Sequence, residues 1–412
     1  MSEHSQNEWL ERYTALGAEL ATKGRESRPL AAGFTAFVDA LYKLGDASLE
    51  RLRTTDTSLL APAAATGIQE IQKRLREGRD GEIVIDDPNA GAVLESIFGA
   101  PAHLRGGGTA VHACASWAQL GRQPLLALSE RNTDQLHVLH PAARIAEQGQ
   151  LRTPKEVTAG AASATRNHIL EFTKGMRYGE TELPRSSRIS VRLGPKGLQQ
   201  DPDFAAESIL LGAHGAVGLV SGLNGLPNED TQGLAWVTKL VSGWKESGFS
   251  FVHCELAEFE NREQARRILD AITPEVDSIG MSADELNFLT RTGASPTENA
   301  ATIAEAMNLK RVVVHGDKLA FSIHRLDPVL QQTAMMAGCL AAANKASTGV
   351  PQADLTVPPG AVFASAEADQ LQQPHGWRLS AAVSPYLEKP SSTIGLGDTF
   401  VSGDLFVQSS LS

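Results

Sequence analysis

Apolar and polar positions recur with two periods along the second half of the chain, and together they predict strands that alternate with helices. From about residue 205 each short apolar run is followed by a longer amphipathic segment. The predicted helices cover 204–215, 230–248, 261–272, a segment that opens at Ser282, and 295–307, and the predicted strands cover 216–223, 249–256, 276–281 and 311–316. Such alternation predicts an α/β fold whose doubly wound, mainly parallel central sheet is flanked by helices, with ligands at the carboxyl ends of the strands.

The first half of the chain has a different pattern. Strand-like runs at 81–90, 166–175 and 186–194 are not followed at once by helices, so they are expected to pair in a smaller sheet. We interpret this sheet as a smaller β-rich lid domain that closes over substrate and excludes water. The expected large domain covers 1–80, 112–155 and 195–412, and the expected lid covers 81–111 and 156–194.

Composition limits the possible partners. The 412 residues contain 37 Lys and Arg against 48 Asp and Glu, a net charge of -11, which disfavours nucleic acid and anionic membranes. Three widely separated cysteines offer no disulfide framework or zinc motif, and the polar N-terminus lacks a signal sequence, so a cytoplasmic location is expected. No pattern demands a second copy, and the oligomeric state stays open.

The most informative stretch lies near the C-terminus, in "TIGLGDTFVSGDL". Gly395 and Gly397 precede Asp398 and Thr399, which are good helix-opening residues, so the stretch predicts a turn into a terminal helix. Converging N–H groups and the helix N-terminus can hold an anion there without a basic side chain. Asp398 beside such an anion suits a general base that takes a proton from an incoming hydroxyl, as phosphoryl transfer to an alcohol requires. A tight turn with an Asp cap is the structural alternative.

With its flanks, "PSSTIGLGDTFVSGDL" resembles the C-terminal signature of the ribokinase-like sugar kinases, and most closely that of the ADP-dependent glucokinase and phosphofructokinase family. Other segments are similar to that family in the same order along the chain. They are "AAGFTAFVDAL", "LRGGGTAVHACASWAQLG", "HILEFTKG", "SRISV", "GLVSGLNGL", "VHCELAEF" and "VVVHGDKLAFSIHR". The resemblance implies a carbohydrate kinase that moves a phosphoryl group from ADP, with magnesium, to a hydroxyl of a hexose or hexose phosphate.

The resemblance also implies roles for individual residues. Asp398 is expected to be the general base, with the backbone around Gly395 and Gly397 as the anion hole. The sugar is expected to contact Asp39, Thr35, Gly107, Gly108 and Thr109. The nucleotide is expected near His253, Ser282, His315 and Gly397, and the magnesium near Glu255 and Glu285. A structural role at the end of a strand is the alternative for His253 and Glu255, and a helix cap is the alternative for Asp39.

Four cations on or near the expected lid could bind an acceptor that already carries a phosphate. They are Lys174, Arg188, Arg105 and Arg192. Solvated surface charge is the alternative for each of them, and a phosphosugar is favoured if two or more face the cleft.

Several positions depart from the family pattern. Thr35 and Phe37 stand where asparagines are common, Thr109 replaces a Gln or Asn, and Ser282 replaces an Asn before Glu285. Changes on the sugar side can redirect specificity, so the acceptor stays open. Two other functions are also compatible with the sequence: an ATP-dependent ribokinase-like kinase of another small alcohol, and a degenerate relative that binds sugar or nucleotide as a sensor.

Overall fold

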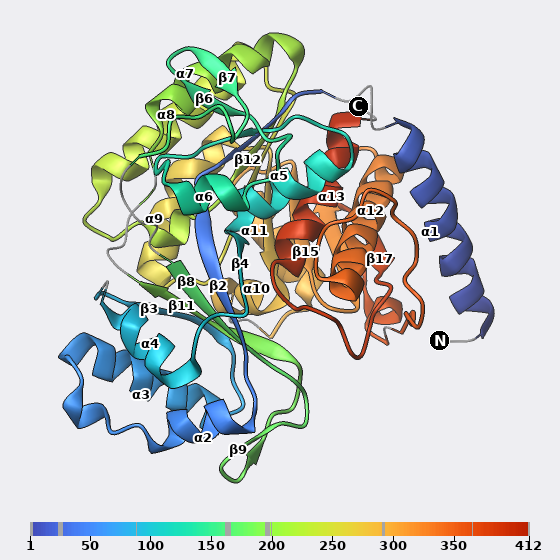
Figure 1. Cartoon of the computed structure of the whole chain (residues 1–412). Coiled ribbons are helices and arrows are strands. Elements are labelled where there is room, and N and C mark those ends of the chain that lie inside the picture. The colour runs from blue at the N-terminus through green and yellow to red at the C-terminus, as the bar shows by residue number, and fades with distance from the viewer. Residues whose placement is uncertain are drawn as a thin grey trace.

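The protein is described here by a computed structural model that covers residues 3–23, 28–87, 89–160, 166–193, 198, 200–290, 293–364 and 366–410. Two sheets organise the chain, and each has its own set of helices and its own apolar core (Figure 1). The larger unit holds most of the chain, and the smaller unit carries the helices α2, α3 and α4 at its outer side (Figure 1).

The large central sheet has the strand order β17-β16-β15-β14-β13-β12-β1-β5. Every neighbouring pair from β5 to β15 is parallel, and β16 and β17 are added antiparallel at one edge. In chain order the strands are β1 (Leu30–Gly33), β5 (Leu125–Leu126), β12 (Val217–Val220), β13 (Phe251–Glu255), β14 (Ser278–Ser282), β15 (Arg311–His315), β16 (Leu319–His324) and β17 (Arg378–Val383). The predicted strand and helix alternation from residue 205 to residue 316 is confirmed.

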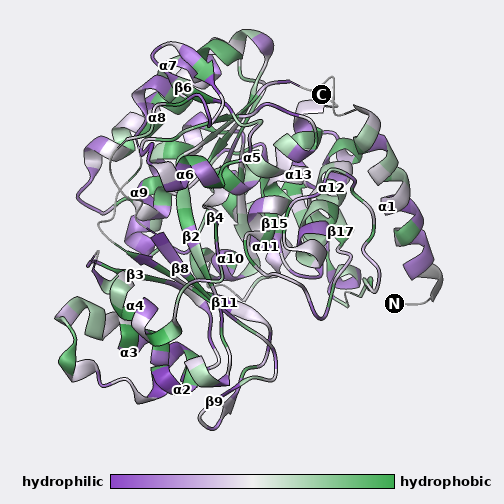
Figure 2. Ribbon diagram, viewed as in Figure 1, coloured by the Kyte–Doolittle hydropathy of each residue, from purple (hydrophilic) through white to green (hydrophobic). Residues whose placement is uncertain are grey.

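Helices cover both faces of this sheet because its central strands are apolar on both sides. In β15, for example, Val312 and Val314 belong to one buried cluster and Val313 belongs to the other. The face that includes Val312 and Val314 is covered by α7 (Pro202–Leu210), α8 (Thr231–Ser247), α9 (Arg262–Ile272), α10 (Ala283–Thr290) and α11 (Pro296–Ala306). The face that includes Val313 is covered by α1 (Glu3–Lys23), α5 (Thr109–Gln119), α12 (Pro328–Thr348) and α13 (Leu396–Ser410). These helices carry both hydrophobic and hydrophilic segments (Figure 2), as expected for helices with one buried face. No helix within the described ranges is long and apolar enough to cross a bilayer.

The smaller unit is built on a five-stranded sheet with the order β3-β11-β8-β2-β4. Its strands are β2 (Phe37–Lys43), β3 (Gly81–Ile85), β4 (His103–Gly107), β8 (Arg166–Phe172) and β11 (Ser187–Leu193), and its helices are α2 (Asp46–Thr54), α3 (Pro62–Arg76) and α4 (Ala90–Phe98). Short elements complete the described chain: α6 (Thr133–Val138) and the hairpins β6 (Ile145–Glu147) with β7 (Gln150–Arg152) and β9 (Arg177–Tyr178) with β10 (Thr181–Glu182). The predicted pairing of the segments around 81–85, 166–172 and 187–193 is confirmed.

The expected boundary of the smaller unit needs correction. Residues 37–80 were expected in the larger unit, but β2 pairs with β4 and β8, and α2 and α3 pack their apolar residues against the smaller sheet. The segment 31–41, "AAGFTAFVDAL", is one of the motifs that resemble the family. It forms two strands in different sheets, because the chain leaves the central sheet after Gly33 and enters the smaller one at Phe37.

Helix α13 packs unusually closely against α12 and is also bonded to the sheet. A Cβ on Gly403 would lie 2.5 Å from the carbonyl oxygen of Ala337, so only glycine fits this helix crossing. Arg311 of β15 and Asp404 of α13 form an ion pair at 2.5 Å, with side chains that are 0% and 2% exposed. The middle of α13 is therefore fixed relative to the start of β15.

We expect Gly403→Ala to destabilise the protein by about 1–3 kcal/mol, because the added methyl group must push two packed helix backbones apart. Chemical denaturation measures the free energy of unfolding. Gly293→Ala is the matched control, because nothing lies within 4 Å of a Cβ at that exposed position. Equal stability of the two variants would contradict the close helix contact.

Candidate active site

A cavity of about 1180 Å³ lies at the carboxyl ends of the central strands and is also lined by the smaller sheet. The described residues that line it include nearly all of the predicted site. These are Thr35, Asp39, Gly108, Thr109, Lys174, Arg188, Glu255, Ser282, Glu285, His315, Gly395, Gly397 and Asp398. Gly107 and His253 do not line it: each lies directly behind, Gly107 against the Asp39 carboxylate and His253 against Glu255.

The glycine turn requires glycine for two different reasons. Gly395 has a φ of +59°, in the left-handed region, and a Cβ there would lie 2.5 Å from the His112 ring and 2.8 Å from Lys345 Nζ. Gly397 has little free space, since its Cβ would lie 3.0 Å from the His315 ring. Helix α13 begins at Leu396, two residues before the expected start, because the Gly395 carbonyl already accepts from Thr399 N–H at 3.0 Å.

Asp398 lies in the first turn of α13 and faces the cavity, with a side chain that is 25% exposed. Its Oδ2 lies 4.0 Å from Nε2 of His112 on α5. His112 Nδ1 in turn lies 3.0 Å from the ammonium of Lys345, which also donates to the Gly395 carbonyl at 3.2 Å. The turn therefore rests on two side chains that our sequence reasoning did not identify. One of them, Lys345, could have been identified from the sequence, because it is a lysine among the small apolar residues of "AMMAGCLAAANKAST".

Glu255 ends β13 and is held between two histidines. Its Oε2 lies 3.1 Å from His253 Nε2, and its Oε1 lies 2.8 Å from His315 Nε2. Burial acts to raise the pKa of Glu255, but the two imidazoles outweigh it and the pKa is lowered. Burial likewise acts to lower the pKa of His315, and the Glu255 carboxylate outweighs it, so this pKa is raised. The three side chains thus form a polar group with a retained carboxylate charge at the strand ends.

Ser282 and Glu285 cap the start of α10. Glu285 Oε2 accepts from the Ser282 N–H at 2.7 Å, and Ser282 Oγ accepts from the Glu285 N–H at 3.2 Å, which is the pattern of a capping box. Burial raises the pKa of Glu285, and the nearby charge of Glu255 adds to the rise. The serine that replaces the family's asparagine therefore has a clear structural role, while both residues still face the cavity.

The two acidic side chains fit a hydrated magnesium ion better than a fully protein-bound one. None of the described residues forms a group of three or more His, Cys, Asp or Glu side chains placed to share a metal. Mg²⁺ keeps several waters and is usually held by one or two carboxylates together with substrate phosphates. Glu255 and Glu285 face one cavity, and the charge of Glu255 helps to raise the pKa of Glu285. A cation bound between them would offset this repulsion.

Asp39 lies within β2 and is 4% exposed. Burial raises its pKa to about 7, although Asn167 Nδ2 donates to Oδ1 at 3.3 Å and opposes the rise. Its carboxyl group faces the same cavity as Asp398. The alternative that Asp39 caps a following helix is wrong, because the next residues continue the strand to Lys43.

The threonines on the same side of the cavity are partly used for structure. Thr35 Oγ1 lies 2.9 Å from Ser221 Oγ and accepts from the Ala110 N–H at 3.3 Å, which joins the ends of β1 and β12 to the start of α5. Gly108, with a φ of +90°, is pressed against the Thr35 backbone, and Thr109 begins α5. The Thr35 hydroxyl is therefore oriented by protein partners.

Three of the four predicted cations face the cavity. Lys174, Arg188 and Arg192 line it, whereas Arg105 does not and donates to the Gly349 carbonyl at 2.7 Å. Arg192 lies over the Phe37 ring at 4.9 Å, so the aromatic residue that replaces an asparagine positions a cation. No ion pair recorded among the described residues involves Lys174. From the sequence, a phosphosugar acceptor was favoured if at least two of the four cations face the cleft, and three of them do.

The smaller sheet also contacts the segment that leads into the glycine turn. Glu171 Oε1 of β8 accepts from Ser392 Oγ and from the Thr393 N–H, both at 3.2 Å. Arg188 of β11 donates to the Thr393 carbonyl at 3.0 Å, and Ile394 packs with Leu41 and Ile169. Any movement of this sheet would therefore act on residues just before Asp398.

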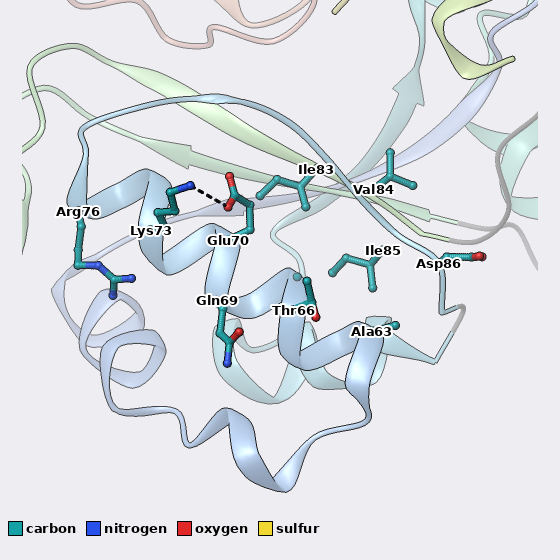
Figure 3. A pocket seen from close by; sticks show the side chains of 11 residues that line it. Ala63, Thr66, Gln69, Glu70, Lys73, Arg76, Ile83, Val84, Ile85 and Asp86 are labelled. Carbon is teal, nitrogen blue, oxygen red and sulfur yellow. Dashed lines mark ion pairs between the residues drawn. The ribbon is translucent and has the colours of Figure 1, made fainter. Parts of the chain in front are cut away.

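A second hollow, of about 750 Å³, lies on the smaller unit between α3 and β3 (Figure 3). It is lined by aliphatic and by polar or charged side chains, and Lys73 and Glu70 at its wall form an ion pair at 3.8 Å. None of the predicted site residues lies in it. The candidate active site is the cavity at the strand ends.

Comparisons with solved structures find proteins of similar fold. The fold resembles a solved ADP-dependent kinase in complex with fructose-6-phosphate and ADPβS, with a TM-score of 0.81, 18% identity and 98% of each chain covered. It also resembles a hypothetical ADP-dependent phosphofructokinase from Pyrococcus horikoshii, with a TM-score of 0.73, 18% identity, and coverage of 93% of this chain and 98% of that one. These likenesses show that the chain shares its fold with the two solved proteins.

The family follows from the sequence comparison. Residues 68–407 match the model of the ADP-specific phosphofructokinase/glucokinase conserved region, so the chain belongs to this family of ADP-dependent sugar kinases. A curated relative, the ADP-specific phosphofructokinase of Methanosarcina acetivorans, is 24% identical over 96% of this chain and 96% of its own. The resemblance stated from the motifs is confirmed.

We expect Glu255→Gln to lower the pKa of His315, because the carboxylate that favours the imidazolium is removed while burial still opposes it. NMR titration of the histidine rings measures this pKa, with His315→Asn used to assign the signal. Asp284→Asn is the control, since it removes a charge from the cavity wall without touching His315. An unchanged His315 titration in the Gln variant would contradict the Glu255 contact.

Proposed function

We propose that this protein transfers the β-phosphoryl group of ADP to a hydroxyl of a hexose phosphate, with fructose 6-phosphate as the first acceptor to test. One observation carries the proposal: the Asp398 carboxylate and the N-terminal turn of α13 share one cavity with Asp39, Glu255 and Glu285. A base for the acceptor and donors for phosphoryl charge are the two parts that this chemistry needs.

The proposed step uses residues of the turn directly. Asp398 takes the proton of the acceptor hydroxyl, whose oxygen forms a bond to the β-phosphorus of ADP. The bridging P–O bond breaks, and AMP leaves with the electron pair. Backbone N–H groups around Gly395–Gly397 face the negative charge that spreads over the moving phosphoryl group. The positive end of the α13 dipole adds to this stabilisation.

The acceptor side favours an anionic sugar. Lys174, Arg188 and Arg192 bring positive charge to the wall of the cavity. A neutral hexose would need none of these charges, whereas a phosphate gains charge-assisted hydrogen bonds from them. Asp39 and the Asn167 amide lie where they could bond sugar hydroxyl groups. The ligand named for the solved relative, fructose-6-phosphate, is an acceptor of this kind.

Glu255 and Glu285 would hold a hydrated magnesium ion, which would neutralise charge on the ADP phosphates when bound. His253 and His315 keep the Glu255 carboxylate ionised and oriented toward the cavity. The smaller sheet is proposed to act as a lid that excludes water from the phosphoryl group. Its bonds through Glu171 and Arg188 to residues 392–393 would then couple closure to the position of the turn.

We expect Asp398→Asn to lower kcat by at least ~10²-fold, the lower end of what a positioned general base contributes. A coupled assay with ADP and with ATP, on fructose 6-phosphate and on glucose, measures it. Asp284→Asn is the matched control, because it removes the same charge from an exposed position on the same cavity.

Equal activity of wild type and Asp398→Asn would reject the assigned base. Activity with ATP alone would favour the ATP-dependent alternative. Thermal stabilisation by ADP or sugar with no product over hours would instead favour a binding protein without turnover.

We expect Lys174→Met to raise KM for fructose 6-phosphate about 10- to 100-fold and to leave kinetics with glucose unchanged, because only the phosphosugar loses a charged partner. Initial-rate measurements with both sugars give the comparison. Lys43→Met is the control, since Lys43 is an exposed cation at the end of β2 that does not line the cavity. A parallel loss for both sugars would show that Lys174 does not read the acceptor phosphate.

A further inference from the structure

Lys345 is a buried cation without a recorded carboxylate partner among the described residues. Its side chain belongs to α12, and the residue is 3% exposed among small apolar neighbours of that helix. Burying an ammonium group costs several kcal/mol unless hydrogen bonds replace its water. The bonds recorded for it go to the Gly395 carbonyl at 3.2 Å and to His112 Nδ1 at 3.0 Å. Both lead to the glycine turn.

The contact with Lys345 determines which nitrogen of His112 carries the proton. An ammonium group can only donate, so Nδ1 must accept and the ring proton lies on Nε2. Burial, followed by the charge of Lys345, holds the pKa of His112 well below its usual range, so the ring is neutral. The Nε2–H therefore lies at the wall of the cavity, and Asp398 Oδ2 lies 4.0 Å from Nε2.

We propose that Lys345 and His112 are positioning residues for Asp398: the ammonium fixes the imidazole tautomer, and the Nε2–H holds the carboxylate in place for the acceptor hydroxyl. The inference rests on the proposed function. The distance of 4.0 Å is too long for a hydrogen bond and must shorten when the acceptor binds, since catalytic hydrogen bonds often tighten only in the substrate complex. Lys345 itself does not line the cavity and acts through His112 and the turn.

The geometry distinguishes this role from simple packing. An apolar side chain of similar volume would fill the space in α12 without the cost of a buried charge. The three groups come from three helices, α12, α5 and α13, and meet only at the turn. A Cβ on Gly395 would collide with both His112 and Lys345, so the turn itself is shaped to admit the pair.

The arrangement predicts that kcat falls at high pH, when Lys345 loses its proton. Burial lowers the pKa of Lys345 to about 8; Asp398 on α13 and Asp39 on β2 oppose the shift, while Arg188 on β11 and Arg105 on β4 add to it. Below this pH the ammonium is present and fixes the tautomer. Above it the neutral amine can also accept, the ring proton is free to move to Nδ1, and kcat falls.

Two substitutions of His112 test the proposal. A glutamine amide can reach the position of Nε2 and keep a donor toward Asp398, whereas an asparagine amide reaches only the position of Nδ1. We expect His112→Asn to lose about tenfold more kcat than His112→Gln, since a misplaced base forfeits part of the ~10²–10⁴-fold that it contributes. Lys345→Met should lower kcat about tenfold. In both Lys345→Met and His112→Gln the fall in kcat near pH 8 should be absent.

Steady-state kinetics with ADP and fructose 6-phosphate from pH 6 to 9.5 give kcat and KM for each variant. Thermal unfolding and ADP titration calorimetry check that each variant folds and binds nucleotide. Two results would overturn the proposal even if Asp398→Asn loses activity as expected. One is an equal kcat for the Gln and Asn variants, and the other is a fall in kcat near pH 8 that persists in Lys345→Met. If Asp398→Asn is as active as wild type, the proposed function itself fails, and the two failures are thereby distinguished.

Discussion

The buried ion pair between Arg311 and Asp404 fixes the helix on which the candidate site depends. It joins the start of β15 to the middle of α13, at 2.5 Å and almost without solvent contact. The glycine crossing of α12 and α13 supplies a second restraint, because it sets the separation of the two helix backbones. Together these contacts place the N-terminal turn of α13 beside the carboxyl ends of the parallel strands, where the phosphoryl chemistry is proposed to occur.

The cavity carries charges of both signs. Glu255 ends β13 and Glu285 lies in the first turn of α10, whereas the smaller unit brings Lys174, Arg188 and Arg192 as well as Asp39 and Glu82. The three cations give a protein with a net charge of -11 local positive charge for anionic ligands. The residues that depart from the family pattern have structural roles of their own. Phe37 holds Arg192, Ser282 caps α10 with Glu285, and Thr35 links β1, β12 and α5.

The two units are joined through the residues that precede the glycine turn. Glu171 and Arg188 bond to the backbone of Thr393 from the smaller sheet, and Lys345 and His112 support Gly395 and Asp398 from the larger unit. The turn is therefore restrained from both sides. A site that uses backbone N–H groups needs such restraint, because preorganised donors stabilise developing charge only if they need not move during reaction.

Local sequence alone determined the secondary structure of the second half of the chain and the family to which the protein belongs. The alternation of periods gave the strands and helices from residue 205 onward, and the order of short motifs gave the family, since turns, caps and buried strands depend on neighbouring residues. Tertiary structure decided three other features. Segment 37–80 joined the smaller sheet, because strand pairing and core packing are non-local. Ser282 and Glu285 were assigned a capping role only once their mutual bonds were seen. Lys345 and His112, which are 233 positions apart, met at the turn because helices α5, α12 and α13 pack together, a contact that no spacing along the chain could reveal.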